Sequence, residues 1–254
     1  MSVDPANVVL ATVATLVAVV FALVTIDRWR RRHQPHVGAW MIAMSLFAVG
    51  AGAFWWAESD AWSMPVFRLF FLVGAVLNVA WLALGSLYLL VGGRTINRVR
   101  TFLVAASFFA TGVVISAPSR GSIPDEGLPR ARDLFGPLPR VMVAVGSGVP
   151  ALVIILGAAW SVWRLLRGRT PALAGAQRVA PLSAARLVLS NVTVMLGTLT
   201  LSASGSLAGR LGEDRAFAVT LTIGVIVLFG GFIIAGSRRG THDAAMSLLG
   251  QRPG

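Results

Sequence analysis

The residues best suited to binding chemistry form a stripe from Asn78 to Tyr88. Asn78, Trp81, Gly85 and Tyr88 are spaced by three, four and three residues, so in a helix they share one face. An amide and two aromatic rings on one face would suit the wall of a ligand pocket. The same stripe would also suit an interhelical hydrogen bond from Asn78 and close packing at Gly85. Both interpretations stay open.

A second polar stripe begins at Asn191 and continues through Thr198 and Ser202. Small residues accompany it in pairs spaced by four, a spacing that lets two helix backbones approach closely. These paired residues are Ser202, Gly205, Ser206 and Gly209. The segment predicts either the lining of a polar ligand site or a contact with another helix. That other helix could belong to a second copy of the chain or to a partner membrane subunit.

Glu58, Asp60 and Arg68 form a compact charged cluster near two predicted helix ends. We expect Glu58 and Arg68 to form an ion pair that ties neighbouring helices together. Because Arg binds phosphate and carboxylate groups with two donors, the cluster is also a candidate site for a head group or another anion.

The sequence lacks the residues that several kinds of chemistry require. All 22 basic residues are Arg, and the chain has neither Lys nor Cys. Without Lys there is no Schiff base to retinal or to a carbonyl substrate. Without Cys there is no disulfide or thiolate metal site. No Asp, Glu or His lies at the centre of an apolar run, where ion carriers and pumps usually hold one. We therefore predict no metal, no cofactor and no catalytic residue.

The composition is typical of a membrane protein. Hydrophobic residues make up 56% of the chain and charged residues 13%, about half the charged share of soluble domains. The mean hydropathy is +0.77. The net charge of +12 is spread in short clusters between apolar runs, which is a pattern of membrane topology and not of a nucleic-acid-binding face.

A membrane-crossing helix needs about 20 mostly apolar residues, and the sequence predicts seven such spans in an all-α bundle. The predicted spans are about 8–26, 37–56, 65–91, 101–117, 141–163, 185–207 and 216–236. Residues 1–236 would form one transmembrane domain, and residues 237–254 a short cytoplasmic tail.

Arginine decides the predicted orientation, because short cytoplasmic loops carry an excess of basic residues. Arg-rich segments follow the first, third, fifth and seventh spans, beginning at Arg28, Arg94, Arg164 and Arg238. All four fall on one side only if the count is seven. We therefore predict an outside N-terminus and a cytoplasmic C-terminus in a bacterial inner (plasma) membrane.

The predicted layout resembles that of the microbial rhodopsins, which also have seven spans and an outside N-terminus. That family needs a Lys in its last span and carboxylates in its third, and this sequence has neither, so the chain is not assigned to it. Spans one and five both end in an Arg-Trp cluster followed by Pro, which would fit a repeat of two three-helix halves. The same pattern also follows from seven spans alone, and the repeat stays open.

Three functions remain, in order of preference. The first is a non-catalytic bundle that acts as a subunit or scaffold, or that holds a lipid or other apolar ligand between spans three and six. The second is a carrier for a small neutral or apolar solute, with a wet cavity near Asn78 and Asn191. The third is a membrane-embedded enzyme whose base would come from Glu58, Asp60 or the Pro-rich loop between residues 117 and 141, which carries five prolines. Membrane lipids are expected partners in each case, and nucleic acid in none.

Overall fold

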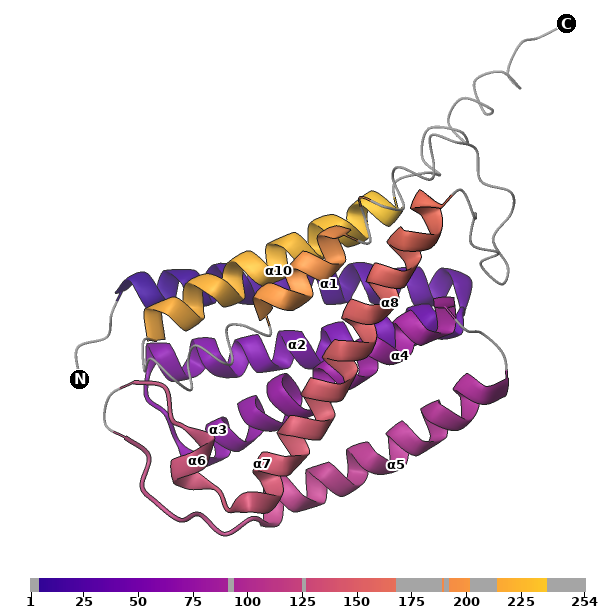
Figure 1. Cartoon of the computed structure of the whole chain (residues 1–254). Coiled ribbons are helices and arrows are strands. Elements are labelled where there is room, and N and C mark those ends of the chain that lie inside the picture. The colour runs from indigo at the N-terminus through magenta and orange to yellow at the C-terminus, as the bar shows by residue number, and fades with distance from the viewer. Residues whose placement is uncertain are drawn as a thin grey trace, which may run out of the picture.

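The computed structural model describes residues 5–90, 94–124, 127–167, 189, 192–201 and 214–236, and the regular elements in these ranges are all helical (Figure 1). Six helical stretches are long and apolar enough to cross a membrane. The predicted all-helical fold is therefore confirmed for the described residues, and the six apolar helices are compatible with a membrane bundle, while the count of seven spans and the orientation stay predictions. A shorter apolar helix, Val192–Leu201, is the described core of the predicted span 185–207, and apart from Leu189 the rest of that span lies outside the described residues.

The six long stretches correspond to the predicted spans 8–26, 37–56, 65–91, 101–117, 141–163 and 216–236. Two of them are subdivided by a π-helical segment. The elements in chain order are α1 (Pro5–Arg32), α2 (Pro35–Ser59), α3 (Met64–Phe70), η1 (Phe71–Leu77), α4 (Asn78–Leu90), α5 (Arg94–Ser116), α6 (Ala131–Leu134), α7 (Pro137–Val143), η2 (Ala144–Gly148), α8 (Val149–Leu166) and α10 (Asp214–Gly236).

Prolines set where three of the helices begin. Pro35, Pro65 and Pro137 lie in the first turn of α2, α3 and α7, where the N–H that proline lacks has no partner within the helix. The chain reverses between α1 and α2 at His33, which adopts the left-handed region with a φ of 49°.

The first helices form antiparallel neighbours. The indole of Trp29, near the end of α1, lies against Gly38, near the start of α2. Trp40 of α2 lies against Gly85, near the end of α4. A side chain at Gly85 would overlap the Trp40 indole, so glycine lets α2 and α4 approach each other here.

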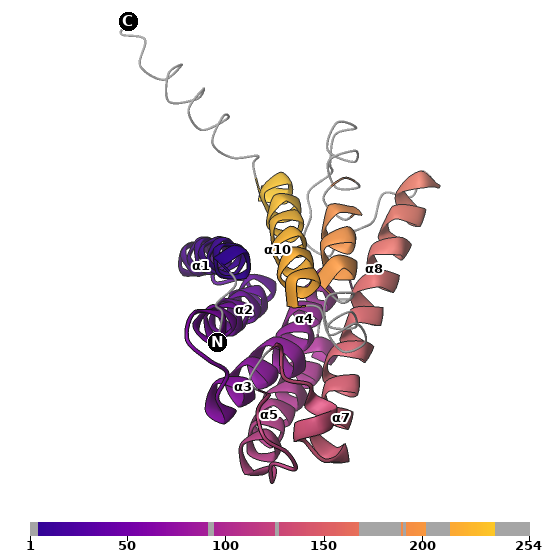
Figure 2. The ribbon, with the colours of Figure 1, turned by 90° about the vertical axis from the view of Figure 1, so that its left-hand side faces the viewer.

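The helices α1 and α10 run parallel. The hydroxyl of Thr222 donates a hydrogen bond to the carbonyl of Leu10 at 3.2 Å, and further along both helices the rings of Phe21 and Phe232 lie 5.0 Å apart. Residue numbers therefore rise in the same direction along both helices. Figure 2 shows α1 and α2 on one side of the molecule and α8 on the other, with α10 between them.

The two π-helical segments lie against each other. A Cβ atom on Gly146 of η2 would lie 2.7 Å from the carbonyl oxygen of Val76 in η1, so only glycine allows this approach. Along the chain, α7 contacts η1, and α8 contacts α4. The fifth stretch therefore runs parallel to the third.

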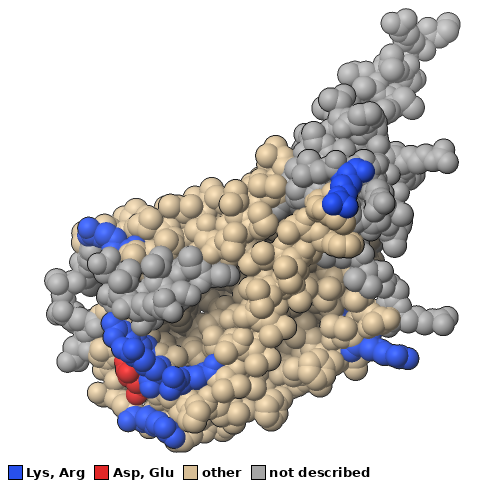
Figure 3. All heavy atoms as spheres, viewed as in Figure 1, with Lys and Arg blue, Asp and Glu red and all other residues tan. Residues whose placement is uncertain are grey.

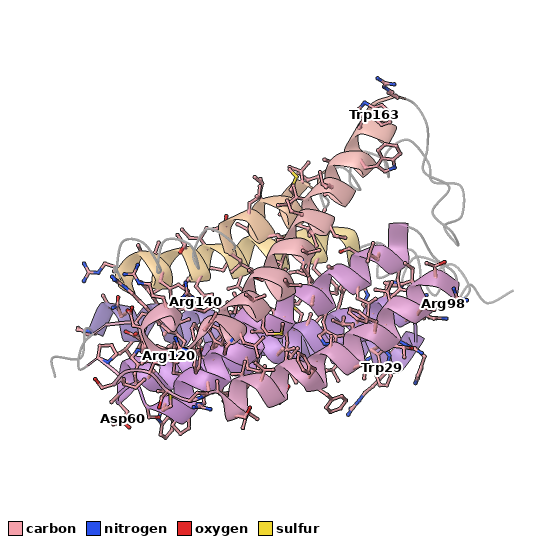
Figure 4. The ribbon with its side chains drawn as sticks, turned by 60° about the horizontal axis from the view of Figure 1, so that its bottom comes forward. Trp29, Asp60, Arg98, Arg120, Arg140 and Trp163 are labelled. Atoms are coloured by element: carbon pink, nitrogen blue, oxygen red, sulfur yellow. The ribbon has the colours of Figure 1, made fainter. Side chains whose placement is uncertain are left out.

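On the face that Figure 3 shows, charged side chains gather at the two ends of the bundle, and a band without charged side chains separates them. Asp60, Arg120 and Arg140 lie at one end, and Trp29 and Arg98 lie at the other (Figure 4). We refer to these as the Arg120 end and the Trp29 end. A band of apolar surface between two charged ends is the arrangement that a lipid bilayer requires.

Candidate functional site

Asn78 begins α4 directly after the π-helical segment η1. Its side chain is only 5% exposed, and its Oδ1 atom has no hydrogen-bond partner among the residues that the structure describes. Counted along the helix, Asn78 shares a face with Gly74 and Gly85, both of which lie close to α2. It therefore occupies the seam between α2 and α4, where a buried amide oxygen without a donor is costly.

Trp81 and Tyr88 both form side-chain hydrogen bonds with residues of α5. The indole Nε1 of Trp81 donates to the hydroxyl of Ser107 at 3.3 Å, and the hydroxyl of Tyr88 donates to Oδ1 of Asn97 at 3.1 Å. The predicted stripe is therefore divided between two neighbours, because Gly85 meets α2 and the two aromatic residues meet α5. The two hydrogen bonds also establish that α4 and α5 are antiparallel.

The bond between Trp81 and Ser107 should stabilise the pairing of α4 with α5. We expect Trp81→Phe and Ser107→Ala each to lower the stability, with a coupling of about 1 kcal/mol between them in a double-mutant cycle. Denaturation with SDS in mixed micelles would measure the four free energies. Fully additive effects would show that this bond contributes nothing.

The second predicted stripe is described only in part. Thr198 is buried, and its hydroxyl donates to the carbonyl of Val194 in its own helix at 2.8 Å. The other residues of that stripe lie outside the described residues. They are Asn191, Ser202, Gly205, Ser206 and Gly209.

Glycines join the helix Val192–Leu201 to α10. A Cβ atom on Gly197 would lie 2.7 Å from the backbone nitrogen of Leu228, and one on Gly231 would lie 3.0 Å from the backbone nitrogen of Val194. These contacts make the two helices antiparallel. Gly224 also makes a close contact, because a Cβ atom there would lie 2.7 Å from the Leu201 side chain, whereas nothing lies within 4 Å of the Cβ position of Gly230.

The charged cluster is arranged differently from the expectation. Asp60 is exposed at the end of α2, and Glu58 is partly exposed one turn earlier. The guanidinium of Arg68 turns to the last turn of α5, where it donates to the carbonyl oxygens of Val114 at 3.1 Å and Ala117 at 2.6 Å. The expected Glu58–Arg68 ion pair is thus replaced by contacts with backbone carbonyls.

The segment between α5 and α7 folds back into the bundle. Leu134 and Phe135 are each 1% exposed, and the ring of Phe135 stacks on Phe67 of α3 with centroids 5.6 Å apart. The backbone N–H of Arg120 donates to the carbonyl of Leu134 at 3.0 Å. The predicted Pro-rich loop is therefore anchored by two core residues that the sequence reading did not single out.

Arginines gather on this anchored segment. The guanidinium of Arg120 lies against Gly136, since a Cβ atom there would be 3.3 Å from its Cζ. Arg140 is exposed in the first helical turns after Gly136, and both arginines lie at the same end of the bundle (Figure 4). Figure 3 shows basic side chains along one edge of a hollowed, mostly uncharged face.

Metal binding finds no support in the described ranges, where no three His, Asp or Glu side chains gather. No model of a known protein family matches the sequence, and no curated protein matches it with significance. The function proposed below therefore rests on the geometry of the described residues.

Proposed function

We propose that the chain is a non-catalytic bundle that crosses the bacterial plasma membrane seven times and holds a lipid along α7, η2 and α8. One observation carries the lipid-binding proposal. Only 6% of the residues in the apolar window of Pro137–Trp160 and 11% of those in Thr95–Ser116 are buried inside the molecule, against 56% in Met64–Tyr88 and 50% in Arg215–Ile234. Nearly all residues of this stretch are therefore at least partly exposed, and those along one side are exposed.

The shape of the neighbouring surface favours a lipid over a second protein. The exposed side chains on this stretch include Val145, Val149, Leu152 and Leu156, which offer branched alkyl groups and no polar anchor. The hollow in Figure 3 adjoins the same stretch. An acyl chain can fill an uneven apolar surface at little cost, because it adapts its shape to the groups around it.

Helix directions support seven crossings. Successive stretches from α1 to α8 alternate in direction, which makes α7–η2–α8 the fifth crossing and parallel to the first. The helix α10 is also parallel to α1, and it is antiparallel to Val192–Leu201. If α10 were the sixth crossing, it would run opposite to α1. Because α1 and α10 run in the same direction, the number of crossings from α1 to α10 must be odd. This favours one further crossing between α8 and α10, with Val192–Leu201 as its core.

Single-cysteine labelling would test both the count and the orientation, since the chain has no native Cys. With seven crossings, Arg167→Cys and Arg215→Cys lie on opposite sides of the membrane. We expect a membrane-impermeant maleimide to label Arg215→Cys in intact spheroplasts, and Arg167→Cys only after lysis. Labelling of both from one side would mean six crossings. The reverse pattern would invert the orientation.

The lipid itself can be sought in the purified protein. After extensive washing in a mild detergent, we expect phospholipid to remain in a fixed ratio to protein, as measured by mass spectrometry of a solvent extract. Adding lipid back to delipidated protein should raise its melting temperature, because a ligand stabilises the state that binds it. The proposal would be contradicted if the purified chain retained no lipid and if added lipid left its melting temperature unchanged.

A further inference from the structure

We propose that Arg120 and Arg140 form a site for the phosphate head group of an anionic phospholipid. This inference rests on the proposed lipid-binding function and names the part of the lipid that is recognised. The site lies at the Arg120 end of the bundle, on the segment that joins α5 to α7.

The segment is held in place by the core beneath it. Leu134 and Phe135 are buried between the ends of the helices. The backbone hydrogen bond from Arg120 to Leu134 closes the segment into a loop. Arg120 then lies against Gly136, the residue before α7, and Arg140 follows in the first helical turns. Two guanidinium groups are thus brought to the start of one helix by contacts that do not depend on a ligand.

The arginines at this end of the bundle differ in the partners that the described residues give them. Arg68 is engaged by carbonyl oxygens of α5, and Arg132 lies 3.4 Å from Asp133. Within the described part of the chain, neither an ion pair nor a side-chain hydrogen bond engages the guanidinium groups of Arg120 and Arg140. Guanidinium groups bind phosphate oxygens through paired N–H donors, so a phosphate group complements this cluster.

The surroundings of Arg140 favour a lipid phosphate over a soluble one. Leu138 and Val141, on either side of Arg140, are 52% and 51% exposed, and the apolar stripe of η2 and α8 continues from them. A charged head group beside exposed alkyl side chains matches the boundary between head groups and acyl chains. One phospholipid could then place its phosphate at the arginines and its acyl chains along α7, η2 and α8.

The test compares arginines at the two ends of the bundle. Arg120→Gln/Arg140→Gln removes two charges from the proposed site, and Arg98→Gln/Arg100→Gln removes two exposed charges at the Trp29 end as the matched control. The probes are dioctanoyl phosphatidylglycerol, dioctanoyl phosphatidylcholine and glycerol phosphate, added to the full chain in detergent. Native mass spectrometry and Trp fluorescence would give each dissociation constant.

We expect wild type to bind phosphatidylglycerol more tightly than phosphatidylcholine. Each arginine near a lipid head group contributes about 1 kcal/mol, so the double variant at the site should bind phosphatidylglycerol about 30-fold more weakly. The control variant should bind as wild type does, and glycerol phosphate should bind to none of them.

Four outcomes would overturn the proposal. An equal loss in the control variant would mean that net charge alone attracts the lipid. Tight binding of glycerol phosphate would mean a site for a soluble anion. Equal affinities for the two lipids would mean that the arginines select no head group, although the proposed lipid-binding function would stand. If wild type binds neither lipid, the proposed function fails as well.

Discussion

Replacing Arg68 with glutamine should lower the free energy of unfolding by about 3 kcal/mol, because it leaves carbonyl oxygens without their donors at the end of α5. The last carbonyls of a helix have no partner within it. Here Arg68 supplies donors to Val114, Ile115 and Ala117. Its positive charge also lies at the negative end of the α5 dipole.

Denaturation with SDS in mixed micelles would measure the loss. Arg132→Gln is the matched control, because Arg132 is exposed and its only described partner is the neighbouring Asp133, so it should change the stability by well under 1 kcal/mol. Arg68→Lys keeps the charge but not the planar fork of donors, and it should fall between wild type and Arg68→Gln. Equal stability of Arg68→Gln and wild type would show that water replaces the guanidinium at no cost.

The role of Arg68 marks a limit of sequence reading. A residue pattern predicts partners from side-chain type, so the carboxylate of Glu58, ten residues away in the chain, was the natural expectation. The actual acceptors are backbone carbonyls that lie 46 to 49 residues away. Every residue carries such a carbonyl, so residue type does not reveal which of them lacks a donor.

Helix positions were more predictable than side-chain contacts. The apolar runs located all six long helices, because burial in lipid demands an unbroken apolar segment. The helix ends extend further than the runs, as in α1, which continues to Arg32. Polar residues such as Asp27 and Arg31 stay helical beyond the apolar region, and their side chains form an ion pair at 2.9 Å.

The candidate site was harder to foresee. The stripe from Asn78 to Tyr88 lies on one helix as predicted, but its members contact different neighbours, because α4 is packed against both α2 and α5. The arginines at the Arg120 end were visible in the sequence only as parts of a loop of mixed charge. Their grouping depends on Leu134 and Phe135 entering the core, and a loop with five prolines carries no periodic pattern that would predict this burial.

The other large expected effect concerns Gly197. We expect Gly197→Ala to lower the free energy of unfolding by about 2 kcal/mol, because added bulk in a well-packed contact forces the backbone to move. The new Cβ atom would lie 2.7 Å from the backbone nitrogen of Leu228 and 2.9 Å from its Cα. No side-chain rotation relieves an overlap with backbone atoms, so Val192–Leu201 and α10 must separate.

Gly230→Ala is the matched control, because it makes the same substitution in α10, where nothing lies within 4 Å of the Cβ position. An alanine in an open helical position should stabilise the helix by about 0.5 to 1 kcal/mol. The two variants should therefore shift the SDS denaturation midpoint in opposite directions. A shift of the same sign and size in both would mean that the two helices do not meet at Gly197. The antiparallel contact between Val192–Leu201 and α10 would then no longer support seven crossings.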